Sequence, residues 1–386
     1  MSTRREQNDF VDAHVRALDS LRDRDRYRKL VARCGLDFSS NDYLGLAASS
    51  ELSLAATRAI DRGVPVGATG SRLLRGHHEE HEALEIEAAQ FFGSERALYF
   101  SSGFGANYAL FSTLPARGDL VVYDEFIHAS VHDGLHAGHA NCVKARHNDP
   151  QSFLDAVQVW RGKGGCGRVW LGVESLYSMD GDRAPIDALY EVANSCDGFL
   201  VVDEAHASGV WGREGRGFAS HLEGRDNVIT MHTCGKALGV MGGLVCARAP
   251  LIEFLVNRAR AFIYATAPSP LVAAVLRDVL RLIETGDDRR KRLHDLIDFG
   301  GGLLSDTCGV ACSQSQIQPV ILKSDAHALE VANVMQKNGF DVRAIRPPTV
   351  PRGTSRLRIS FTLNVTRDDV QAMALSLDRA LRCAVT

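Results

Sequence analysis

The sequence lacks most of the features that would direct it to a membrane, a nucleic acid or an oxidising compartment. No apolar run is long enough to span a bilayer, and residues 1–30 are polar and charged, unlike a secretory signal. The formal net charge is only −3, which gives no basic surface for nucleic acid. The nine cysteines are scattered without a CxxC pair. We therefore expect reduced thiols in a cytoplasmic protein, and neither a zinc knuckle nor a disulfide framework.

Hydrophobic patterning divides the chain into three parts. Residues 1–45 predict a charged, mainly helical segment, with a helix over about 8–33. Residues 46–285 predict a large α/β domain, because short continuous runs of Val, Leu and Ile alternate with helix-length segments. Such runs indicate strands buried on both faces, and hence a mostly parallel sheet with helices on both faces. Residues 286–386 predict a smaller C-terminal α+β domain.

The individual elements follow from the same patterns, with no internal repeat or low-complexity tract between them. Strands in the large domain are predicted at 97–100, 119–124, 168–175, 198–205, 227–233 and 242–247. Its helices are predicted near 104–114, 150–160, 186–196 and 268–286. The small domain is predicted to have strands at 317–323, 341–347 and 355–361, and helices at 326–338 and 367–382.

Two polar residues follow consecutive predicted strands of the large domain. Asp203 ends the apolar run GFLVV, and Lys236 lies just past the run NVITMHT, among small residues and without an acidic neighbour. In a parallel sheet, ligands bind beyond the carboxyl ends of the strands. Pyridoxal phosphate enzymes need a lysine that forms a Schiff base and an acid that faces the pyridine nitrogen. Singly, Asp203 could cap a turn and Lys236 could be a loop lysine, but together they favour this cofactor.

A phosphate site is also indicated. The stretch SSGFGAN (101–107) is a glycine-rich turn that opens a helix, where backbone N–H groups can bind an anion. Thr233, three residues before Lys236, could add a hydroxyl group. His128 follows the predicted strand DLVVYD, where an imidazole could stack on an aromatic ring. Each feature alone is explained by an ordinary turn or helix start, so only the set supports a phosphorylated aromatic cofactor.

The chain resembles the α-oxoamine synthase family of fold-type I pyridoxal phosphate enzymes over nearly its whole length. The resemblance runs in family order from about residue 28 to 360, and its last stretch favours the biotin-pathway member. The matching stretches are LDFSSNDYLGL (36–46), GSRLLRGHHEEHEALE (70–85), FSSGFGANYAL (100–110), DEFIHASVHDG (124–134), ESLYSMDGDRAP (174–185), VVDEAHASGVWGREGRG (201–217), TCGKALGVMGG (233–243), IYATAPSP (263–270) and AIRPPTVPRGTSRLRIS (344–360).

The resemblance implies catalytic roles for four residues. Lys236 would hold the cofactor covalently and move the substrate's α-proton, while Asp203 would face the pyridine nitrogen. His206 would contact the phenolic oxygen of the ring, and His128 would stack on the ring face. The further residues implied to contact the cofactor are Gly103, Phe104, Ser178, Thr233 and Thr266. Those implied to contact the substrates are Arg28, Asn41, Thr349 and Arg358.

The activity implied by the resemblance is a decarboxylative condensation of L-alanine with a pimeloyl thioester of coenzyme A or a carrier protein. The implied assembly is a homodimer with a shared active site, in which Thr266 reaches the partner's phosphate. Relatives use glycine or serine with other acyl groups, so that alternative stays open. Because Lys236, Asp203, His206 and His128 are all present, a catalytically dead regulatory subunit is disfavoured. Cys234, where relatives often have Leu or Phe, has no assigned role.

One motif indicates a different function class. In RGHHEEHEALE (75–85), His77, Glu80 and His81 fit the HxxEH pattern of zinc hydrolases. The alternative is a charged, solvated first turn of an amphipathic helix, with Leu84 and Ile86 pointing inward. No third ligand is apparent in the sequence, which favours the helix and predicts no metal.

Overall fold

The structure, a computed structural model, describes residues 10–383. These residues form two compact units. The larger unit comprises residues 41–297 and 362–364, and the smaller unit contains the rest of the described chain. None of the helices within 10–383 combines the length and the apolar character needed to cross a membrane.

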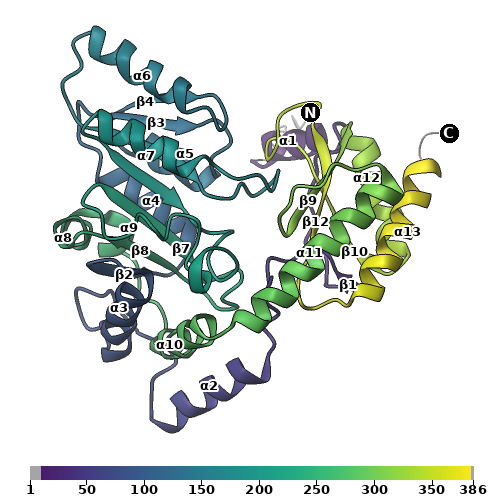
Figure 1. The fold of residues 1–386 in the computed structure, drawn as a ribbon, viewed down its shortest axis with the longest axis horizontal. Helices are drawn as coiled ribbons and strands as arrows, with labels where there is room; N and C mark the ends of the chain where they lie inside the picture. The colour runs from purple at the N-terminus through teal and green to yellow at the C-terminus, as the bar shows by residue number, and fades with distance from the viewer. Residues whose placement is uncertain (1–9, 384–386) are drawn as a thin grey trace, which may run out of the picture. The chain divides into compact units, whose positions relative to one another are not determined.

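A seven-stranded sheet forms the centre of the larger unit (Figure 1). Its strands lie in the order β2, β8, β7, β6, β5, β3, β4. β8 runs antiparallel to both neighbours, whereas the other neighbouring strands pair in parallel. The predicted mostly parallel sheet is therefore confirmed. The strands are β2 (Arg96–Phe100), β3 (Leu120–Asp124), β4 (Asn141–Ala145), β5 (Val169–Glu174), β6 (Phe199–Asp203), β7 (Val228–Thr233) and β8 (Gly243–Ala247).

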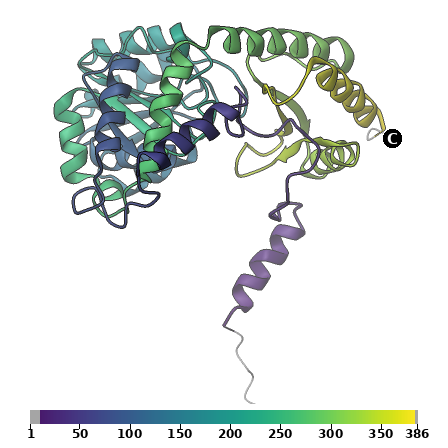
Figure 2. The same cartoon turned by 90° about the horizontal axis from the view of Figure 1, so that it is seen from below.

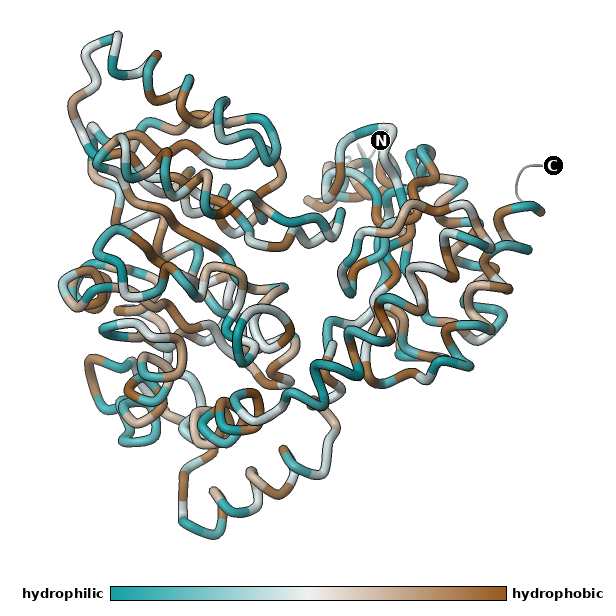
Figure 3. Tube along the Cα trace, in the orientation of Figure 1, coloured by the Kyte–Doolittle hydropathy of each residue, from teal (hydrophilic) through white to brown (hydrophobic). Residues whose placement is uncertain are grey.

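Helices cover both faces of this sheet, as the continuous apolar runs predict. Val121 and Val201 pack in one buried cluster with α4, α5, α8 and α9, whereas Val122 and Val202 pack in another with α6 and α7. Successive side chains of a strand point to opposite faces, so both sets of positions must be apolar. Figure 3 shows these strands largely in brown. The helices are α4 (Gly103–Thr113), α5 (Ala129–Ala137), α6 (Pro150–Gly162), α7 (Ile186–Ser195), α8 (Ala249–Arg258) and α9 (Arg260–Ile263).

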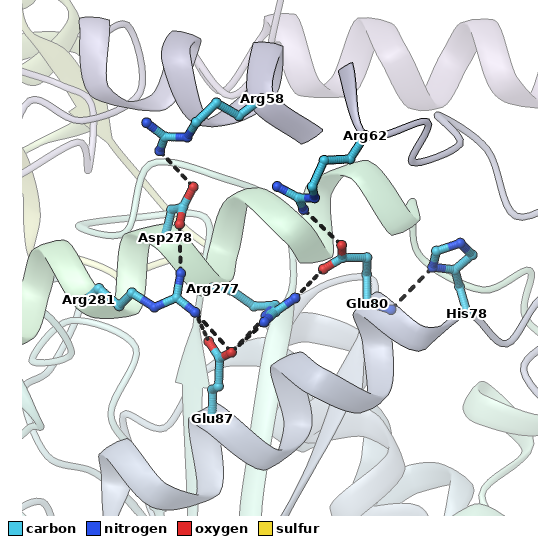
Figure 4. A network of polar contacts seen from close by, with 8 residues as sticks. All are labelled: Arg58, Arg62, His78, Glu80, Glu87, Arg277, Asp278 and Arg281. Carbon is cyan, nitrogen blue, oxygen red and sulfur yellow. Dashed lines mark hydrogen bonds and ion pairs between the residues drawn. The ribbon is translucent and has the colours of Figure 1, made fainter. Parts of the chain in front are cut away.

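Three further helices of the larger unit, α2 (Ser50–Asp61), α3 (Glu79–Phe92) and α10 (Pro270–Glu284), are joined by ion pairs (Figure 4). α10 starts with the capping residue Ser269 followed by Pro270, and buries an apolar stripe along its length. Its other side carries arginines that meet carboxylates from α3 and from α10 itself. The pairs are Glu80 with Arg62 and Arg277, Glu87 with Arg277 and Arg281, and Asp278 with Arg58 and Arg281.

The smaller unit has the mixed character predicted for the C-terminal region. Its main sheet is antiparallel with the strand order β11, β12, β9, and β1 pairs in parallel with β10. Leu357 and Ile359 of β12 are fully buried. The strands are β1 (Leu36–Asp37), β9 (Ile317–Lys323), β10 (Phe340–Asp341), β11 (Arg343–Ile345) and β12 (Ser355–Ser360). The helices are α11 (Asp287–Cys308), within which the two units divide, α12 (Asp325–Lys337) and α13 (Arg367–Cys383).

The long N-terminal helix predicted over about 8–33 is wrong. Residues 8 and 9 lie outside the described range, and the helix observed, α1, covers only Asp12–Arg22. None of its residues is buried, and Figure 2 shows it projecting away from the other elements of its unit. A charged helix without a packed face gains little tertiary stabilisation. The chain leaves the helix before Asp25, whose φ is +56°.

Candidate functional site

Three polar residues end neighbouring strands at one edge of the central sheet. Glu174 is the last residue of β5, Asp203 of β6 and Thr233 of β7. Glu174 and Asp203 are register partners across the β5–β6 pair. All three are buried. The parallel strands therefore bring together residues that are far apart in sequence, at the edge where such sheets bind ligands.

Lys236 follows β7 and meets His206, which follows β6. The Lys236 Nζ is 2.8 Å from His206 Nε2, and His206 Nδ1 is 2.6 Å from the hydroxyl oxygen of Tyr43. The Tyr43 hydroxyl donates to Asn41 Oδ1 at 3.0 Å. One arrangement satisfies this chain of bonds: the tyrosine donates to the amide, His206 Nδ1–H donates to the tyrosine, and Nε2 accepts from the lysine. Sequence analysis missed Tyr43, which orients His206.

Asp203 is held by residues from α4 and from its own loop. Asn107 Nδ2 donates to Asp203 Oδ2 at 2.7 Å, and the Ala205 N–H donates to Oδ1 at 2.8 Å. Asn107 also donates to the Ser130 hydroxyl at 3.0 Å. The carboxylate is therefore fixed in one orientation by neutral partners. Asn107 and Ser130 were not predicted as site residues.

His128 belongs to the same hydrogen-bonded group. It caps the N-terminus of α5, and its Nδ1 lies 2.8 Å from the Ser130 hydroxyl oxygen. Removal of water by the surrounding protein lowers the pKa of His128, while the carboxylate of Asp203 acts in the opposite direction and Lys236 lowers it further. The neutral form of the His128 imidazole is therefore favoured. This form can stack on an aromatic ring, because stacking does not need a charge.

An anion-binding turn forms where β2 passes into α4. Ser102 caps this helix through the Gly105 N–H, and the first-turn N–H groups of a helix have no partner within it. A Cβ atom at position 103 would lie 2.9 Å from Thr233 Oγ1, so only glycine lets the turn approach the end of β7 so closely. Gly103 and Thr233 are therefore in contact, as a phosphate site made from both would need. Phe104 is about half exposed.

Glu174 is a further site residue that the sequence did not predict. The Ser178 N–H donates to its Oε2 at 3.1 Å, which places the predicted Ser178 beside the strand ends. Its Oε1 is buried and has no hydrogen-bond partner within residues 10–383. Burial raises the pKa of Glu174 well above its ordinary value, and the neighbouring Asp203 raises it further. The signal in the sequence was its place at the end of the run VWLGV.

The remaining predicted site residues are divided between the two units. Thr266 is exposed and borders a small pocket with Ser101 and Arg72 in the larger unit. In the smaller unit, Arg28 Nη2 lies 3.4 Å from Thr349 Oγ1. Arg358 is buried on β12 and donates to the Ser360 hydroxyl at 2.8 Å.

The histidine-rich start of α3 does not form a metal site. His81 Nε2 lies 2.8 Å from the Pro268 carbonyl oxygen, and His77 Nδ1 accepts from Arg72 Nε. Glu80 is paired with Arg62 and Arg277, as described above. The expected solvated first turn is only partly confirmed, because Glu79 and Glu82 are exposed but Glu80 and His81 are buried. Ile86, expected to point inward, is 53% exposed. Leu84 is buried, as predicted.

Within residues 10–383, the one group of metal-ligand type with closely spaced atoms is Glu223, His232 and Cys246. Both nitrogens of His232 are already engaged, with Ser208 on one side and with Glu223 and Thr230 on the other. Cys234, the unexplained neighbour of the lysine, is fully buried, and burial raises the pKa of its thiol. It is a core residue.

The chain is similar to known proteins over most of its length. A sequence model of the family described as aminotransferase class I and II matches residues 34–377. An 8-amino-7-oxononanoate synthase from Chromobacterium violaceum is 40% identical over 353 residues, covering 91% of this chain and 90% of the relative. Another from Aromatoleum aromaticum is 38% identical over 388 residues, covering 96% and 98%.

Solved structures give the same result. A Sphingomonas wittichii serine palmitoyltransferase matches with a TM-score of 0.88 and 26% identity, covering 99% of each chain. An 8-amino-7-oxononanoate synthase from Francisella tularensis matches with a TM-score of 0.77 and 29% identity, covering 91% of this chain and 99% of that one. The chain belongs to the aminotransferase class I and II family and, within it, to the α-oxoamine synthases of fold type I.

Proposed function

We propose that this chain is a pyridoxal phosphate-dependent acyltransferase that condenses L-alanine with a pimeloyl thioester. The products are 8-amino-7-oxononanoate, carbon dioxide and the free thiol, which places the enzyme in biotin synthesis. The observation that carries the proposal is the Lys236–His206–Tyr43 arrangement beside Asp203, in a chain 40% identical to an 8-amino-7-oxononanoate synthase.

The polar groups at the strand ends fit pyridoxal phosphate. Gly103 and Phe104 at the N-terminus of α4, with the hydroxyl of Thr233, would hold the phosphate. Asp203 would pair with the ring nitrogen, and His206 would contact the phenolic oxygen. Gly103 and Thr233 approach so closely that a Cβ atom at position 103 would lie 2.9 Å from Thr233 Oγ1, and this close approach supports the fit.

Three other residues would complete the cofactor site. Lys236 would carry the cofactor, His128 would lie against the ring, and Ser178 would add a contact from the loop after β5. When bound, pyridoxal phosphate supplies an aldehyde that a primary amine can attack and a ring that delocalises the electrons of an α-carbanion. His128 is favoured in its neutral form, which suits contact with a ring.

The chain's own groups would then handle the protons. A lysine attacks a carbonyl only in its neutral form, and His206 Nε2 accepts its hydrogen bond at 2.8 Å. We assign to Lys236 the transfer of the proton from the α-carbon of alanine and its return after carbon dioxide is lost; the hydrogen bond to His206 supports this role. Asp203, fixed by Asn107, would keep the ring nitrogen protonated throughout.

Substrate contacts are assigned from the family positions. Asn41 and Arg358 would bind the carboxylate of alanine, and Arg28 and Thr349 would be further substrate contacts. The acyl group would arrive on coenzyme A or on a carrier protein. The contact of Arg28 with Thr349 supports a common role for these two residues.

We also propose a cytoplasmic homodimer with a shared active site, in which Thr266 reaches the phosphate of the other subunit. Thr266 is exposed in the single chain. Large apolar side chains elsewhere in the larger unit are exposed too: Leu74 by 82%, Tyr264 by 71% and Met241 by 68%. Burial of these side chains against a partner subunit would favour the dimer.

The test is a thiol-release assay that crosses alanine, glycine and serine with pimeloyl, acetyl, succinyl and palmitoyl thioesters. The proposal expects alanine with the pimeloyl thioester to give the highest kcat/KM. The similarity to a serine palmitoyltransferase structure makes serine with the palmitoyl thioester the second candidate. A higher kcat/KM for any other pair would overturn the substrate assignment and leave the reaction class in place.

A further inference from the structure

His147 lies between the two loops of the larger unit that carry His128 and Ser178. Its Nδ1 is 2.8 Å from Asp124 Oδ1, and its Nε2 is 2.7 Å from Asp182 Oδ2. Asp124 ends β3, four residues before His128. Asp182 closes the loop after β5 that contains Ser178. One imidazole therefore joins two segments that are separate in sequence.

The first segment is tied to the histidine by several bonds. The buried carboxylate of Asp124 also accepts from the Phe126 N–H at 2.9 Å and from the Asn148 N–H at 2.8 Å. The His147 N–H donates to Glu125 Oε1 at 3.0 Å. These bonds fix the backbone immediately before His128, the residue proposed to lie on the cofactor ring.

The second segment is tied in the same way. The Tyr177 N–H donates to the Asp182 carbonyl at 3.0 Å, which closes the loop around Ser178. The Tyr177 ring packs edge-on against His147, with ring centres 4.4 Å apart. Asn148 Nδ2 adds a bond to Asp182 Oδ2 at 2.8 Å. Displacement of Asp182 would therefore change the position of Ser178.

Only the charged form of His147 can serve both carboxylates, because a neutral imidazole has a single N–H and an imidazolium has two. Burial would lower the pKa of His147, but the bonds to Asp124 and Asp182 outweigh it and raise the pKa to about 10. Burial alone would raise the pKa of Asp124, but its hydrogen bonds, first of all the one from His147, outweigh burial and lower the pKa. Tyr177 and Glu125 are two further titratable residues that contact His147.

We propose that His147, as an imidazolium bridging Asp124 and Asp182, is a positioning residue that holds the His128 and Ser178 loops in the geometry needed to bind the cofactor. The inference rests on the proposed function, because it gives both loops a role in cofactor binding. His147 itself need not touch the cofactor.

The test is the dissociation constant of pyridoxal phosphate for the full-length apoprotein, measured by absorbance titration. Supporting contacts behind the ligands of metal sites are typically worth about 10- to 100-fold in affinity. By analogy, we expect His147→Gln to bind the cofactor at least about ten-fold more weakly. A matched control is His221→Gln, which breaks an exposed pair with Asp187 in the same unit and should bind like the wild type.

Three further readouts separate positioning from a general loss of stability. Added imidazole should restore cofactor affinity in His147→Ala, and not in His221→Ala. The affinity difference between wild type and His147→Gln should shrink as the pH rises through about 10. Asp182→Asn, at a side chain that is 41% exposed, should fold and still lose affinity.

The possible results distinguish a failure of the positioning role from a failure of the proposed function. If folded His147→Gln and Asp182→Asn bind pyridoxal phosphate as tightly as the wild type, the positioning role is wrong. If these variants lose stability alone, with unchanged affinity, the bridge is structural and the inference is again overturned. If the wild type does not bind pyridoxal phosphate, the proposed function itself fails.

Discussion

Two regions of the larger unit are rich in buried histidine and carboxylate, and they are built in opposite ways. At the strand ends, Asp203 is held by the neutral groups of Asn107 and Ala205, and Lys236 meets a histidine. At the start of α3, Glu80 meets two arginines. In the first region neutral groups hold the buried carboxylate, whereas in the second region two arginines neutralise it.

The difference shows that residue type and spacing alone do not determine whether a polar side chain can bind a ligand or take part in catalysis. HxxEH has the spacing of a metal site, yet α10 and the Pro268 carbonyl engage its groups. The spacing between Asp203 and Lys236 matches no short sequence motif. The two residues nevertheless lie at one edge of the sheet, because the strands that precede them, β6 and β7, pair in parallel. Partners supplied by other elements determine whether a polar cluster is structural or functional.

The largest effect should come from the strand-end region. Lys236→Ala removes the amine that is proposed to carry the cofactor and move the α-proton. We expect turnover to fall by at least about a thousand-fold. Lys291→Ala, at an exposed lysine paired with Asp295, is the control and should keep full activity. Near-normal turnover in Lys236→Ala would rule out its role.

The next test compares Asp203 with a carboxylate from the ion-pair network that joins α3 to α10. Asp203→Asn should slow exchange of the alanine α-proton in heavy water by about 100-fold, because the ring nitrogen loses its acidic partner. Asp278→Asn, in the ion-pair network of Figure 4, should leave the exchange rate of folded protein unchanged. Equal effects of the two substitutions would remove the distinction between the regions.

The reverse comparison uses stability. Glu80→Gln removes the carboxylate that pairs with Arg62 and Arg277, while Arg277 keeps its pair with Glu87. The free energy of unfolding should fall by about 2 kcal/mol. Turnover per folded molecule should not change. Glu79→Gln, at the exposed neighbouring position, is the control and should be nearly neutral in urea denaturation. A loss of activity without a loss of stability would place α3 in the chemistry after all.

The smallest expected effect is on the pH dependence of the free energy of unfolding, to which His81 and His147 contribute in opposite ways. Burial, followed by Arg72, lowers the pKa of His81 to about 4, whereas the pKa of His147 is raised. The contribution of neutral His81 is present above its unfolded pKa of about 6.5 and is lost as the pH falls towards 4, by about 1 kcal/mol at pH 5.5. His81→Gln should abolish this part of the acid-side loss of stability in urea titrations. An unchanged acid slope would contradict the assignment.

Much of this architecture is predictable from sequence because the central strands are continuously apolar. β4 was missed because four of its five residues are exposed at a sheet edge and its sequence, NCVKA, contains only one large apolar residue, Val143. α11 was missed because its sequence is charged at one end and contains three consecutive glycines.

The candidate site was predictable in its strand-end and motif residues, but not in its supporting residues. Tyr43 reaches His206 across 163 positions, and Asn107 reaches Asp203 across 96. Such contacts depend on tertiary packing, which no local pattern records. His147 was missed for the same reason, since its two carboxylates come from different loops.

The central claim is that the strand ends around Lys236 hold the cofactor. Borohydride reduction of the pyridoxal phosphate-loaded protein, followed by peptide mass spectrometry, tests it most directly, because reduction fixes the cofactor to the lysine that carries it. The account predicts one modified peptide, with the added mass on Lys236. Modification of a different lysine, or of none, would contradict it.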